Sequence, residues 1–339
     1  MTRPPMGVML HTGDLSYPDI VRFANEAEGL GFDGFFLTEE SGKEAFSLLA
    51  LLARETSTIG LGTSIVNFYS RTPTLLAMAA RSLYELSEGR FGPLGLGSGG
   101  VGFMHRGHGI ALDRPVGRAR ETVEIIRSLL SEPRTSYDGK WFHVDDFHLR
   151  EGPLRGAAKI PLWLAALGPQ MAAMSARVAD GMITNWLIPE SLEEFRLLIK
   201  QECDRAGRDP SEVTIATLLM VSADSEDEDA RQAARRGVAF YCASEHYLHI
   251  ADLAGHGEQA RRVKEVWETR DFDAATRLVT DEMVERFTVT GSEEECAAKV
   301  QWLLGEGVYP IVYPLPRHHQ MFEDHVGTIK NVARYAKMA

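Results

Sequence analysis

Polar side chains follow short apolar segments at several points along this chain. His11 ends the apolar run 7–11, and the carboxylates Glu39 and Glu40 follow the run 34–38. A carboxylate acts as a general acid or base when burial raises its pKa, and a histidine does so near neutral pH. Glu39, Glu40 and His11 are therefore candidate proton-transfer residues. The alternative for the two glutamates is an ordinary place at a helix start or on the surface.

The segment 59–73, IGLGTSIVNFYSRTP, places many hydrogen-bonding groups directly after a buried strand. Its first half is apolar and β-branched, as in a strand covered on both faces. Asn67, Tyr69, Ser70 and Arg71 follow, and Pro73 suits the first turn of the next helix. In α/β proteins, ligands bind at this end of the strands. The segment therefore predicts part of a binding site, with a plain strand-to-helix loop as the alternative.

The glycines Gly95, Gly97 and Gly100 match the letters of a dinucleotide-binding fingerprint. That fingerprint needs a helix to begin at the third glycine, so that its N-terminus meets the pyrophosphate. Here the chain continues through VGFMHRGHG, and the next helix signal is at Pro115. We therefore expect a long loop over 99–113 and no Rossmann site. The glycines then form a strand end against which a planar ring can lie.

A second candidate site for an anion lies at Gly168, Pro169, Gln170 and Met171, which open a helix directly after the apolar run 160–166. The free N–H groups and the dipole of a helix N-terminus attract phosphate and carboxylate groups. Proline has no N–H, so Gln170, Met171 and the following residues would donate. The alternative is a plain tight turn.

The histidines do not indicate a metal site. His105 and His108 lie three apart in a glycine-rich stretch, and His318 and His319 follow the last apolar run. A metal site needs three or four convergent ligands with supporting carboxylates, and nothing in the sequence joins these two pairs. We therefore expect no bound metal, and histidines that face solvent or substrate.

Composition is that of a soluble cytoplasmic enzyme. The chain has 339 residues, of which 44% are hydrophobic and 25% charged, with a formal net charge of −12. The negative charge and the absence of a basic run argue against a nucleic-acid partner. No signal peptide or membrane-spanning run is recognised. The three cysteines, Cys203, Cys242 and Cys296, follow no metal or redox spacing.

Apolar segments alternate with helical patterns along the whole chain, which predicts a single α/β domain over 1–339 that forms a (β/α)8 TIM barrel. The expected strands are 7–11, 34–38, 59–66, 93–98, 160–166, 181–186, 213–221 and 308–315. A doubly wound open sheet is the rival fold. A helical stretch from about 226 to 286 exceeds a normal connection, so we expect a helical insertion at about 238–289, between strands seven and eight. In the helix 74–88, the inward side chains are expected to be Leu75, Met78, Ala79, Leu83 and Leu86.

Taken together, five segments resemble the bacterial luciferase-like superfamily of flavin and deazaflavin oxidoreductases. They are LGTSIVNFYSRTP (61–73), LSEGRF (86–91), RPVGRARETVEIIR (114–127), AALGPQM (165–171) and VADGMITNW (178–186). They occur in the family's order and span most of the chain. The first and fourth are most similar to the branch that uses the deazaflavin coenzyme F420, typified by methylenetetrahydromethanopterin reductase.

The resemblance implies a barrel whose mouth holds the tricyclic ring at the third strand. It also implies a non-prolyl cis peptide in that strand, which by position would join Ser64 and Ile65. The residues implied to bind the cofactor are Thr63, Ser64, Ile65, Asn67, Gly97, Gly99, Gly168, Pro169, Gln170, Met171, Asn185 and Trp186. Among them, residues 168–171 would receive the cofactor's phosphate.

This chain also departs from the family pattern. Ser64 stands where glycine is usual, Phe68 where proline is common, and Thr72 where histidine is common. Gln170 stands where lysine is frequent, which weakens the expected phosphate site. The pair Glu39–Glu40 replaces the Asp-His or His-His often found after strand two. The identity of the proton donor therefore stays open.

The resemblance leaves more than one function open. In the first, a reduced deazaflavin transfers hydride to or from a small organic substrate that the sequence does not name. In the second, reduced flavin mononucleotide (FMN) from a separate flavin reductase reacts with dioxygen in a monooxygenase. A third is a non-enzymatic partner subunit, which the intact strand ends argue against. A homodimer is expected by resemblance alone.

Overall fold

The computed structural model describes residues 5–13, 15–222, 228–315 and 321–338. Within them, nine parallel strands form one sheet in the order β3-β2-β1-β11-β10-β9-β8-β5-β4. The strands are β1 Gly7–Leu10, β2 Gly34–Leu37, β3 Gly60–Thr63, β4 Val66–Asn67, β5 Leu94–Gly97, β8 Leu162–Ala165, β9 Gly181–Asn185, β10 Thr214–Val221 and β11 Tyr309–Pro314. Because β3 and β4 are two halves of the predicted third strand, all eight predicted strands are present.

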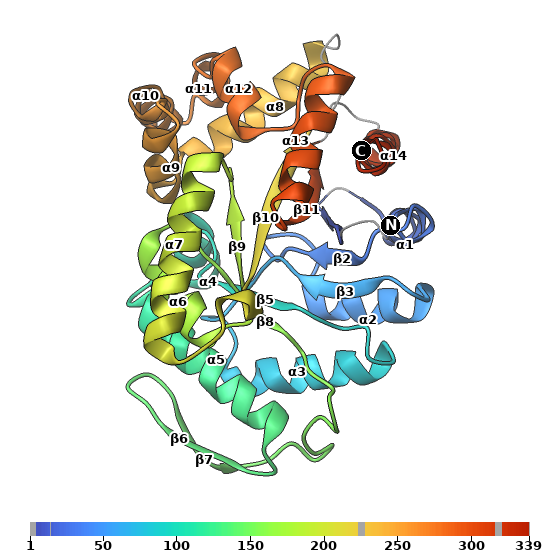
Figure 1. The fold of residues 1–339 in the computed structure, drawn as a ribbon, viewed down its shortest axis with the longest axis vertical. Coiled ribbons are helices and arrows are strands. Elements are labelled where there is room, and N and C mark those ends of the chain that lie inside the picture. Colours follow the sequence, from blue (N-terminus) through green and yellow to red (C-terminus); the bar gives the residue numbers. More distant parts are fainter. Residues whose placement is uncertain (1–4, 14, 223–227, 316–320, 339) are drawn as a thin grey trace.

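The sheet closes on itself between the third and fourth predicted strands. The N–H groups of Leu61 and Thr63 donate to the carbonyls of Arg90 (3.0 Å) and Pro93 (3.2 Å), in the segment that leads into β5. Helices surround the strands (Figure 1). The predicted parallel barrel is therefore confirmed, and the open sheet is excluded.

The helices that surround the barrel mostly begin where the sequence indicates. They are α1 Tyr17–Gly29, α2 Ala45–Glu55, α3 Pro73–Leu86, α4 Val101–His108, α5 Pro115–Ser131, α6 Pro169–Val178, α7 Pro189–Ala206, α13 Glu293–Gly305 and α14 Met321–Tyr335. Ser16 and Thr72 cap α1 and α3 by accepting the N–H groups of Asp19 and Leu75. The helix α4 was not expected, since a loop was predicted over 99–113.

The inside of the barrel is filled by aromatic rings that take space left by glycines. The Phe36 ring stacks near Trp163, with ring centroids 6.2 Å apart, and Tyr309 meets both rings edge-on. A Cβ atom added to Gly7, Gly34 or Gly62 would lie 2.5, 2.8 or 2.9 Å from an atom of the Phe36 ring. Such distances are too short, so these strand positions need glycine to admit the ring.

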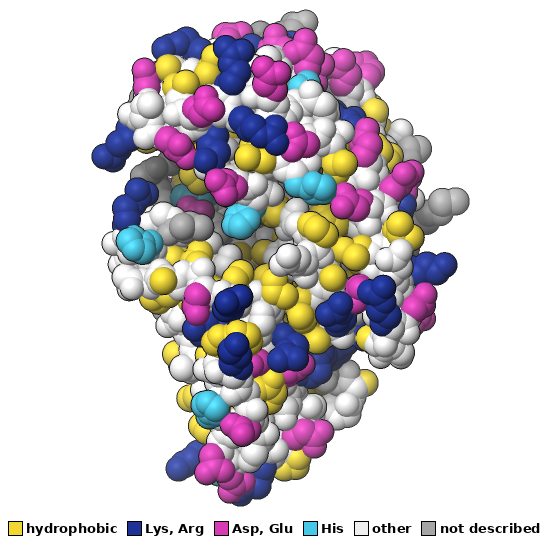
Figure 2. All heavy atoms as spheres, turned by 90° about the vertical axis from the view of Figure 1, so that its left-hand side faces the viewer, with side chains coloured by type: hydrophobic (Ala, Val, Ile, Leu, Met, Phe, Trp, Pro, Cys, Tyr) yellow, Lys and Arg dark blue, Asp and Glu magenta, His cyan; other side chains and the backbone are white. Residues whose placement is uncertain are grey.

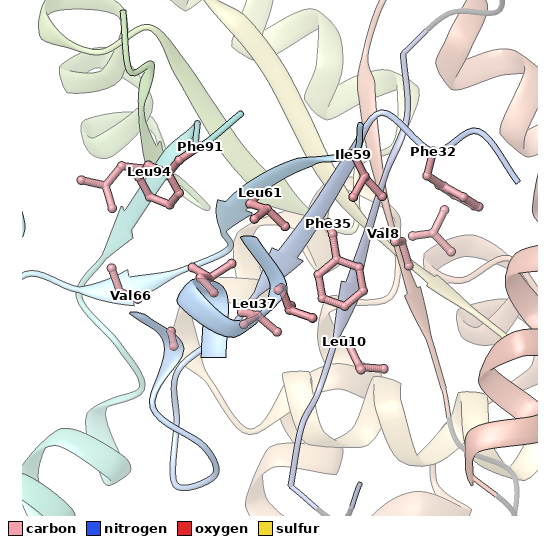
Figure 3. Close-up of a cluster of buried hydrophobic side chains, with 14 of the residues drawn as sticks. Val8, Leu10, Phe32, Phe35, Leu37, Ile59, Leu61, Val66, Phe91 and Leu94 are labelled. Atoms are coloured by element: carbon pink, nitrogen blue, oxygen red, sulfur yellow. The ribbon is translucent and has the colours of Figure 1, made fainter. Parts of the chain in front are cut away.

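A second apolar layer lies between the strands and the surrounding helices. Residues on alternate positions of β1 and β2 belong to it, among them Val8, Leu10, Phe35 and Leu37 (Figure 3). Strands buried on both faces explain why these segments are continuously apolar in the sequence.

The insertion between β10 and β11 consists of short helices and not of one long helix. They are α8 Glu228–Cys242, the 3₁₀ turn η2 Glu245–Tyr247, α9 Leu248–Leu253, α10 Gly257–Glu268, α11 Phe272–Arg277 and α12 Asp281–Phe287. In Figure 1 most of them form the upper part of the molecule. Their apolar side chains pack on the carboxyl ends of β9, β10 and β11, through Trp186, Met220 and Leu315. The chain returns to the barrel at Val289, which bridges to Val221.

The apolar face of α3 is partly rotated from the expected one. Leu83 is buried as predicted, but Leu75, Met78 and Leu86 are 48%, 47% and 43% exposed. The helix buries Leu76, Ala77 and Ala80 in their place. Both sets recur at helical spacing, so periodicity alone does not decide which stripe faces the barrel.

An antiparallel hairpin that the sequence did not predict extends from the barrel between α5 and β8. It is formed by β6 Thr135–Asp138 and β7 His143–Phe147. Its turn is held by the buried carboxylate of Glu121, which accepts the N–H groups of Lys140, Trp141 and Phe142 at 2.8–3.1 Å. A buried charge is tolerated where several donors satisfy it, as they do here.

No helix in the described part of the chain is long and apolar enough to cross a membrane.

A buried histidine makes the folded state sensitive to acid. His325 on α14 is 3% exposed, packs edge-on against Phe23, and its Nδ1 atom has no partner among the described residues. Burial lowers its pKa from 6.5 to about 4. The unfolded chain therefore takes up a proton below pH 6.5 while the folded chain does not, so stability is full above pH 6.5 and falls as the pH drops toward 4.

We expect His325→Phe, which keeps a ring against Phe23, to remove this sensitivity. Between about pH 7.5 and pH 5, the free energy of unfolding should fall by about 2 kcal/mol less in the variant than in the wild type. Urea denaturation at the two pH values measures the difference. Equal losses in both proteins would show that His325 is not the responsible group.

Candidate active site

All candidate residues lie at the carboxyl ends of the strands, which we call the barrel mouth. His11 follows β1, Glu39 and Glu40 follow β2, and residues 63–67 form the junction of β3 and β4. Gly97 ends β5, the residues 168–171 follow β8, and Asn185 ends β9. Parallel pairing brings these ends to one edge of the sheet. Figure 2 shows a hollowed surface with histidine side chains near its rim, on the side where α4, α6 and α9 lie.

The junction between β3 and β4 contains a cis peptide bond between Ser64 and Ile65. This is the bond at which the family resemblance implied one. The N–H of Ser64 donates to the carbonyl of Leu37 (2.8 Å), and the carbonyl of Ile65 accepts the N–H of Glu39 (3.1 Å). The junction is thus attached to the end of β2, where the candidate glutamates stand.

Two residues expected to contact a cofactor are occupied by protein contacts. The Thr63 hydroxyl bonds both the carbonyl and the N–H of Gly95, each at 2.8 Å. A Cβ atom on Gly97 would lie 2.9 Å from Ile65 Cδ1, so Gly97 makes room for the Ile65 side chain. Both residues therefore hold the kinked strand in place, and their contact with a cofactor stays a prediction.

Two buried polar side chains at the junction are not fully satisfied. Asn67 is 1% exposed, and its Oδ1 atom accepts the N–H groups of Tyr69 (3.1 Å) and Ser70 (2.8 Å). Asn67 Nδ2 and Ser64 Oγ have no hydrogen-bond partner among the described residues. Buried donors are normally paired, so unpaired ones at the barrel mouth indicate places where a ligand supplies the partner.

Glu39 is bound in an ion pair. Arg71 donates to both of its carboxylate oxygens, at 2.5 and 2.9 Å, and the Ala45 N–H donates to it at 3.1 Å. Burial opposes the charge of Arg71, but Glu39 and Glu44 outweigh that effect and raise its pKa. Both carboxylate oxygens of Glu39 thus accept hydrogen bonds from protein groups, and an acid role for Glu39 or Glu40 stays a prediction.

Glu40 is near His11 and a group of tyrosines. Its Oε2 atom lies 3.2 Å from His11 Nε2, and both side chains are partly exposed. Burial raises the pKa of Tyr313 to about 12, and the charge of Glu40 adds to that shift. Burial and the same carboxylate also raise the pKa of Tyr241 and of Tyr247. These phenols stay protonated at neutral pH and can donate hydrogen bonds.

Asn185 and Trp186 connect the barrel mouth to the insertion. Asn185 Nδ2 donates to the Tyr247 hydroxyl at 3.2 Å, and Asn185 Oδ1 accepts the N–H of Trp186. The Trp186 ring stacks on Phe287, with centroids 4.1 Å apart, and is 2% exposed. Trp186 also has φ = +55°, which a bulky residue rarely adopts. The two residues thus hold the insertion in place, and a role beside a ring stays a prediction.

The start of α6 is open to a ligand. Gly168 is its N-cap and supplies no side-chain cap, and both Pro169 and Gln170 are exposed. The N–H groups of Gln170 and Met171 therefore have no side-chain cap, and the anion site at this helix start stays a prediction.

The stretch after β5 is helical and not a loop. Gly100 is the N-cap of α4, and His105 and His108 lie on that helix. A helix therefore does begin at the third glycine, contrary to the expected loop over 99–113, although the barrel topology still excludes a Rossmann site. The described residues contain no group of three or more potential metal ligands. His318 and His319 lie outside the described residues.

No signal in the sequence indicates the three buried tyrosines whose pKa values burial and the charge of Glu40 raise. Tyr241 and Tyr247 come from the insertion, whose sequence indicates helices but no contact with the strands, and Tyr313 lies inside β11. Arg71 stood out as a polar residue after the third strand, but its pairing with Glu39 depends on two strand ends meeting.

Similarity to known proteins identifies the family. A family model described as luciferase-like monooxygenase matches residues 1–308. The chain belongs to this family. It is therefore an oxidoreductase of the luciferase-like class, as its sequence motifs indicated.

Two relatives are named 5,10-methylenetetrahydromethanopterin reductase. The one from Archaeoglobus fulgidus is 30% identical over 311 residues, which cover 89% of this luciferase-like chain and 91% of that protein. The one from Methanolobus tindarius is 31% identical over 306 residues, covering 88% and 90%. The solved structure of the coenzyme F420-dependent tetrahydromethanopterin reductase from Methanopyrus kandleri matches with a TM-score of 0.83 and 25% identity, over 98% of both chains.

The mouth of this luciferase-like barrel fits a flavin-type cofactor. Asn67 and Ser64 offer unpaired polar atoms, and the partly exposed Ile65 side chain offers an apolar surface beside them. The uncapped start of α6 offers N–H donors for a phosphate. Polar atoms for a ring edge, an apolar surface and an anion site are the features that such a cofactor needs.

Proposed function

We propose that this protein is a coenzyme F420-dependent oxidoreductase that transfers hydride to or from a small organic substrate. The observation that carries the proposal is the unpaired buried Asn67 amide beside the β3–β4 junction. It is supported by the similarity to a named 5,10-methylenetetrahydromethanopterin reductase (30% identical) and to the solved coenzyme F420-dependent reductase (25% identical). When bound, a reduced deazaflavin supplies a hydride to a carbon–carbon or carbon–nitrogen double bond, or accepts one in reverse.

The chain's own residues bind and orient the reactants in this proposal. Asn67 and Ser64 would hold the polar edge of the ring, and the Ser64–Ile65 junction would support it. The N–H groups of Gln170 and Met171 would hold the phosphate. The insertion, which packs on the carboxyl ends of β9, β10 and β11, would limit access of water, which favours hydride transfer over side reactions.

Proton transfer is assigned to the pair Glu40 and His11. The pair stands after β1 and β2, near the Ser64–Ile65 junction, and its two side chains are within hydrogen-bond distance of each other. A hydride acceptor that becomes an anion or an amine needs a proton, which this pair can deliver. The phenols of Tyr241 and Tyr313, whose pKa values burial and the charge of Glu40 raise, stay protonated and can donate hydrogen bonds to a substrate.

A second candidate function is an FMN-dependent monooxygenase supplied by a separate flavin reductase. The description of the matching family favours it. The same polar and apolar groups of the mouth would then hold the reduced flavin.

A homodimer is also proposed. Its support is the row of exposed apolar side chains on α3, Leu75, Met78 and Leu86, which a second copy of the chain would cover. Light scattering should give twice the chain mass of 37.6 kDa. A monomer mass would contradict the proposal.

Titration of the purified protein with oxidised coenzyme F420 and, separately, with FMN tests the cofactor assignment. We expect micromolar binding of the deazaflavin and weaker binding of FMN, measured by fluorescence. Asn67→Leu, which removes the unpaired donor, should weaken deazaflavin binding about tenfold. Tight FMN binding without deazaflavin binding would favour the monooxygenase.

Replacement of each glutamate separates the proposed acid from its neighbour. Glu40→Gln should lower turnover about a hundredfold and leave the cofactor dissociation constant nearly unchanged, since only the proton is lost. Glu39→Gln is the matched control: it should instead lower the free energy of unfolding by about 1–3 kcal/mol, because it weakens the contact with Arg71. If Glu40→Gln leaves turnover unchanged, the acid lies elsewhere, with His11 next.

A further inference from the structure

The glycine motif that failed as a dinucleotide fingerprint opens a helix at the barrel mouth. The helix α4 begins directly after Gly100, which supplies no side-chain cap. By contrast, α1, α2 and α3 are each capped by a side chain, from Ser16, Glu44 and Thr72. Unlike theirs, the first-turn N–H groups of α4 have no side-chain acceptor, and the helix dipole adds a partial positive charge there.

An unpaired buried amide lies next to this helix start. Asn67 Cβ is 3.4 Å from the position that a Cβ atom on Gly99 would take, and Gly99 directly precedes the N-cap. Asn67 Oδ1 is held by the N–H groups of Tyr69 and Ser70. Nδ2 therefore points away from that loop, and it has no partner among the described residues. A buried donor beside free helix N–H groups calls for an acceptor from outside the protein.

An arginine folds back over the same helical turn. A Cβ atom on Gly102 would lie 2.8 Å from an Nη atom of Arg106, so the guanidinium rests over the first turn of α4. Arg106 is exposed and forms no ion pair with the residues that the structure describes. Three kinds of donor thus lie along the segment 99–102 and the strand end beside it: helix N–H groups, an amide and a guanidinium.

We propose that the first turn of α4, Arg106 and one of the two hydrogens of Asn67 Nδ2 form a subsite for an anionic oxygen group, a phosphate or a carboxylate, which leaves the other hydrogen for the ring. It is distinct from the start of α6, although the two are neighbours because β5 pairs with β8. Guanidinium and helix N-termini are the groups that bind such anions most strongly. Within the proposed function, the anion belongs either to the substrate or to the cofactor, so the substrate class includes organic acids and phosphate esters. Anion binding itself does not depend on that function.

Glycine amide signals locate the anion. In protein labelled with ¹⁵N-glycine, Gly102 reports on α4 and Gly168 on α6, each assigned by its loss in the alanine variant. Inorganic phosphate and, separately, acetate should shift the Gly102 signal of the cofactor-free protein. Asn67→Asp, which keeps the acceptor oxygen but replaces the donor by a negative charge, should weaken the effect at Gly102 more than tenfold. Arg106→Gln should weaken it about tenfold.

The matched control is Arg262→Gln on the exposed surface of α10, which should leave the Gly102 titration unchanged. A Gly102 signal that neither anion moves would overturn the proposal. So would shifts of equal strength in the wild type, Asn67→Asp and Arg106→Gln.

Repeating the titration with saturating deazaflavin separates the two sources of the anion. If phosphate still shifts Gly102, the subsite serves the substrate. If the deazaflavin alone shifts Gly102 and blocks phosphate, the subsite serves the cofactor. Both results support the subsite. A protein that binds no deazaflavin would refute the proposed function and leave the phosphate result standing.

Discussion

The structure depends on how tightly the barrel interior is filled. An eight-stranded barrel leaves room for little more than side chains, so a ring inside it needs strand positions without side chains. Phe36 has this room because Gly7, Gly34 and Gly62 face it from three strands. The aromatic rings close the interior, and ligands are left to the barrel mouth, where the strands end.

At the barrel mouth, hydrogen bonds and ion pairs between protein groups decide which polar side chains remain available to a ligand. Arg71 donates to both oxygens of Glu39, whereas the carboxylate of Glu40, one residue later, lies within hydrogen-bond distance of His11. The Thr63 hydroxyl donates to the Gly95 carbonyl, whereas Asn67 Nδ2 has no partner among the described residues. Polar residues close together in the chain thus differ in role according to the protein groups that they bond.

The helical insertion is attached to the barrel mouth at the end of β9. Its helices are fixed to the end of β9 by the Asn185–Tyr247 hydrogen bond and by the stack of Trp186 on Phe287. Substitutions at this junction should therefore act on the position of Tyr241 and Tyr247 near Glu40. Much of the apolar surface of α8 to α12 is buried in this contact, which explains why helices of six to fifteen residues are stable there.

The sequence by itself determined the barrel, because apolar strand segments, caps and glycines are local signals that repeat eight times. It also located the β3–β4 junction, the start of α6 and the candidate acids, since strand ends can be recognised from local pattern.

The sequence did not determine the helix α4, because a glycine-rich stretch with histidines carries weak helix propensity and only packing makes it helical. Nor did it determine which stripe of α3 faces inward, since two stripes share one period. The pairing of Arg71 with Glu39, the contact of Glu40 with His11 and the hydrogen bond of Tyr247 with Asn185 were decided by tertiary structure alone. Each joins residues that are distant in the chain, and no local pattern records which of two neighbouring carboxylates a distant arginine will reach.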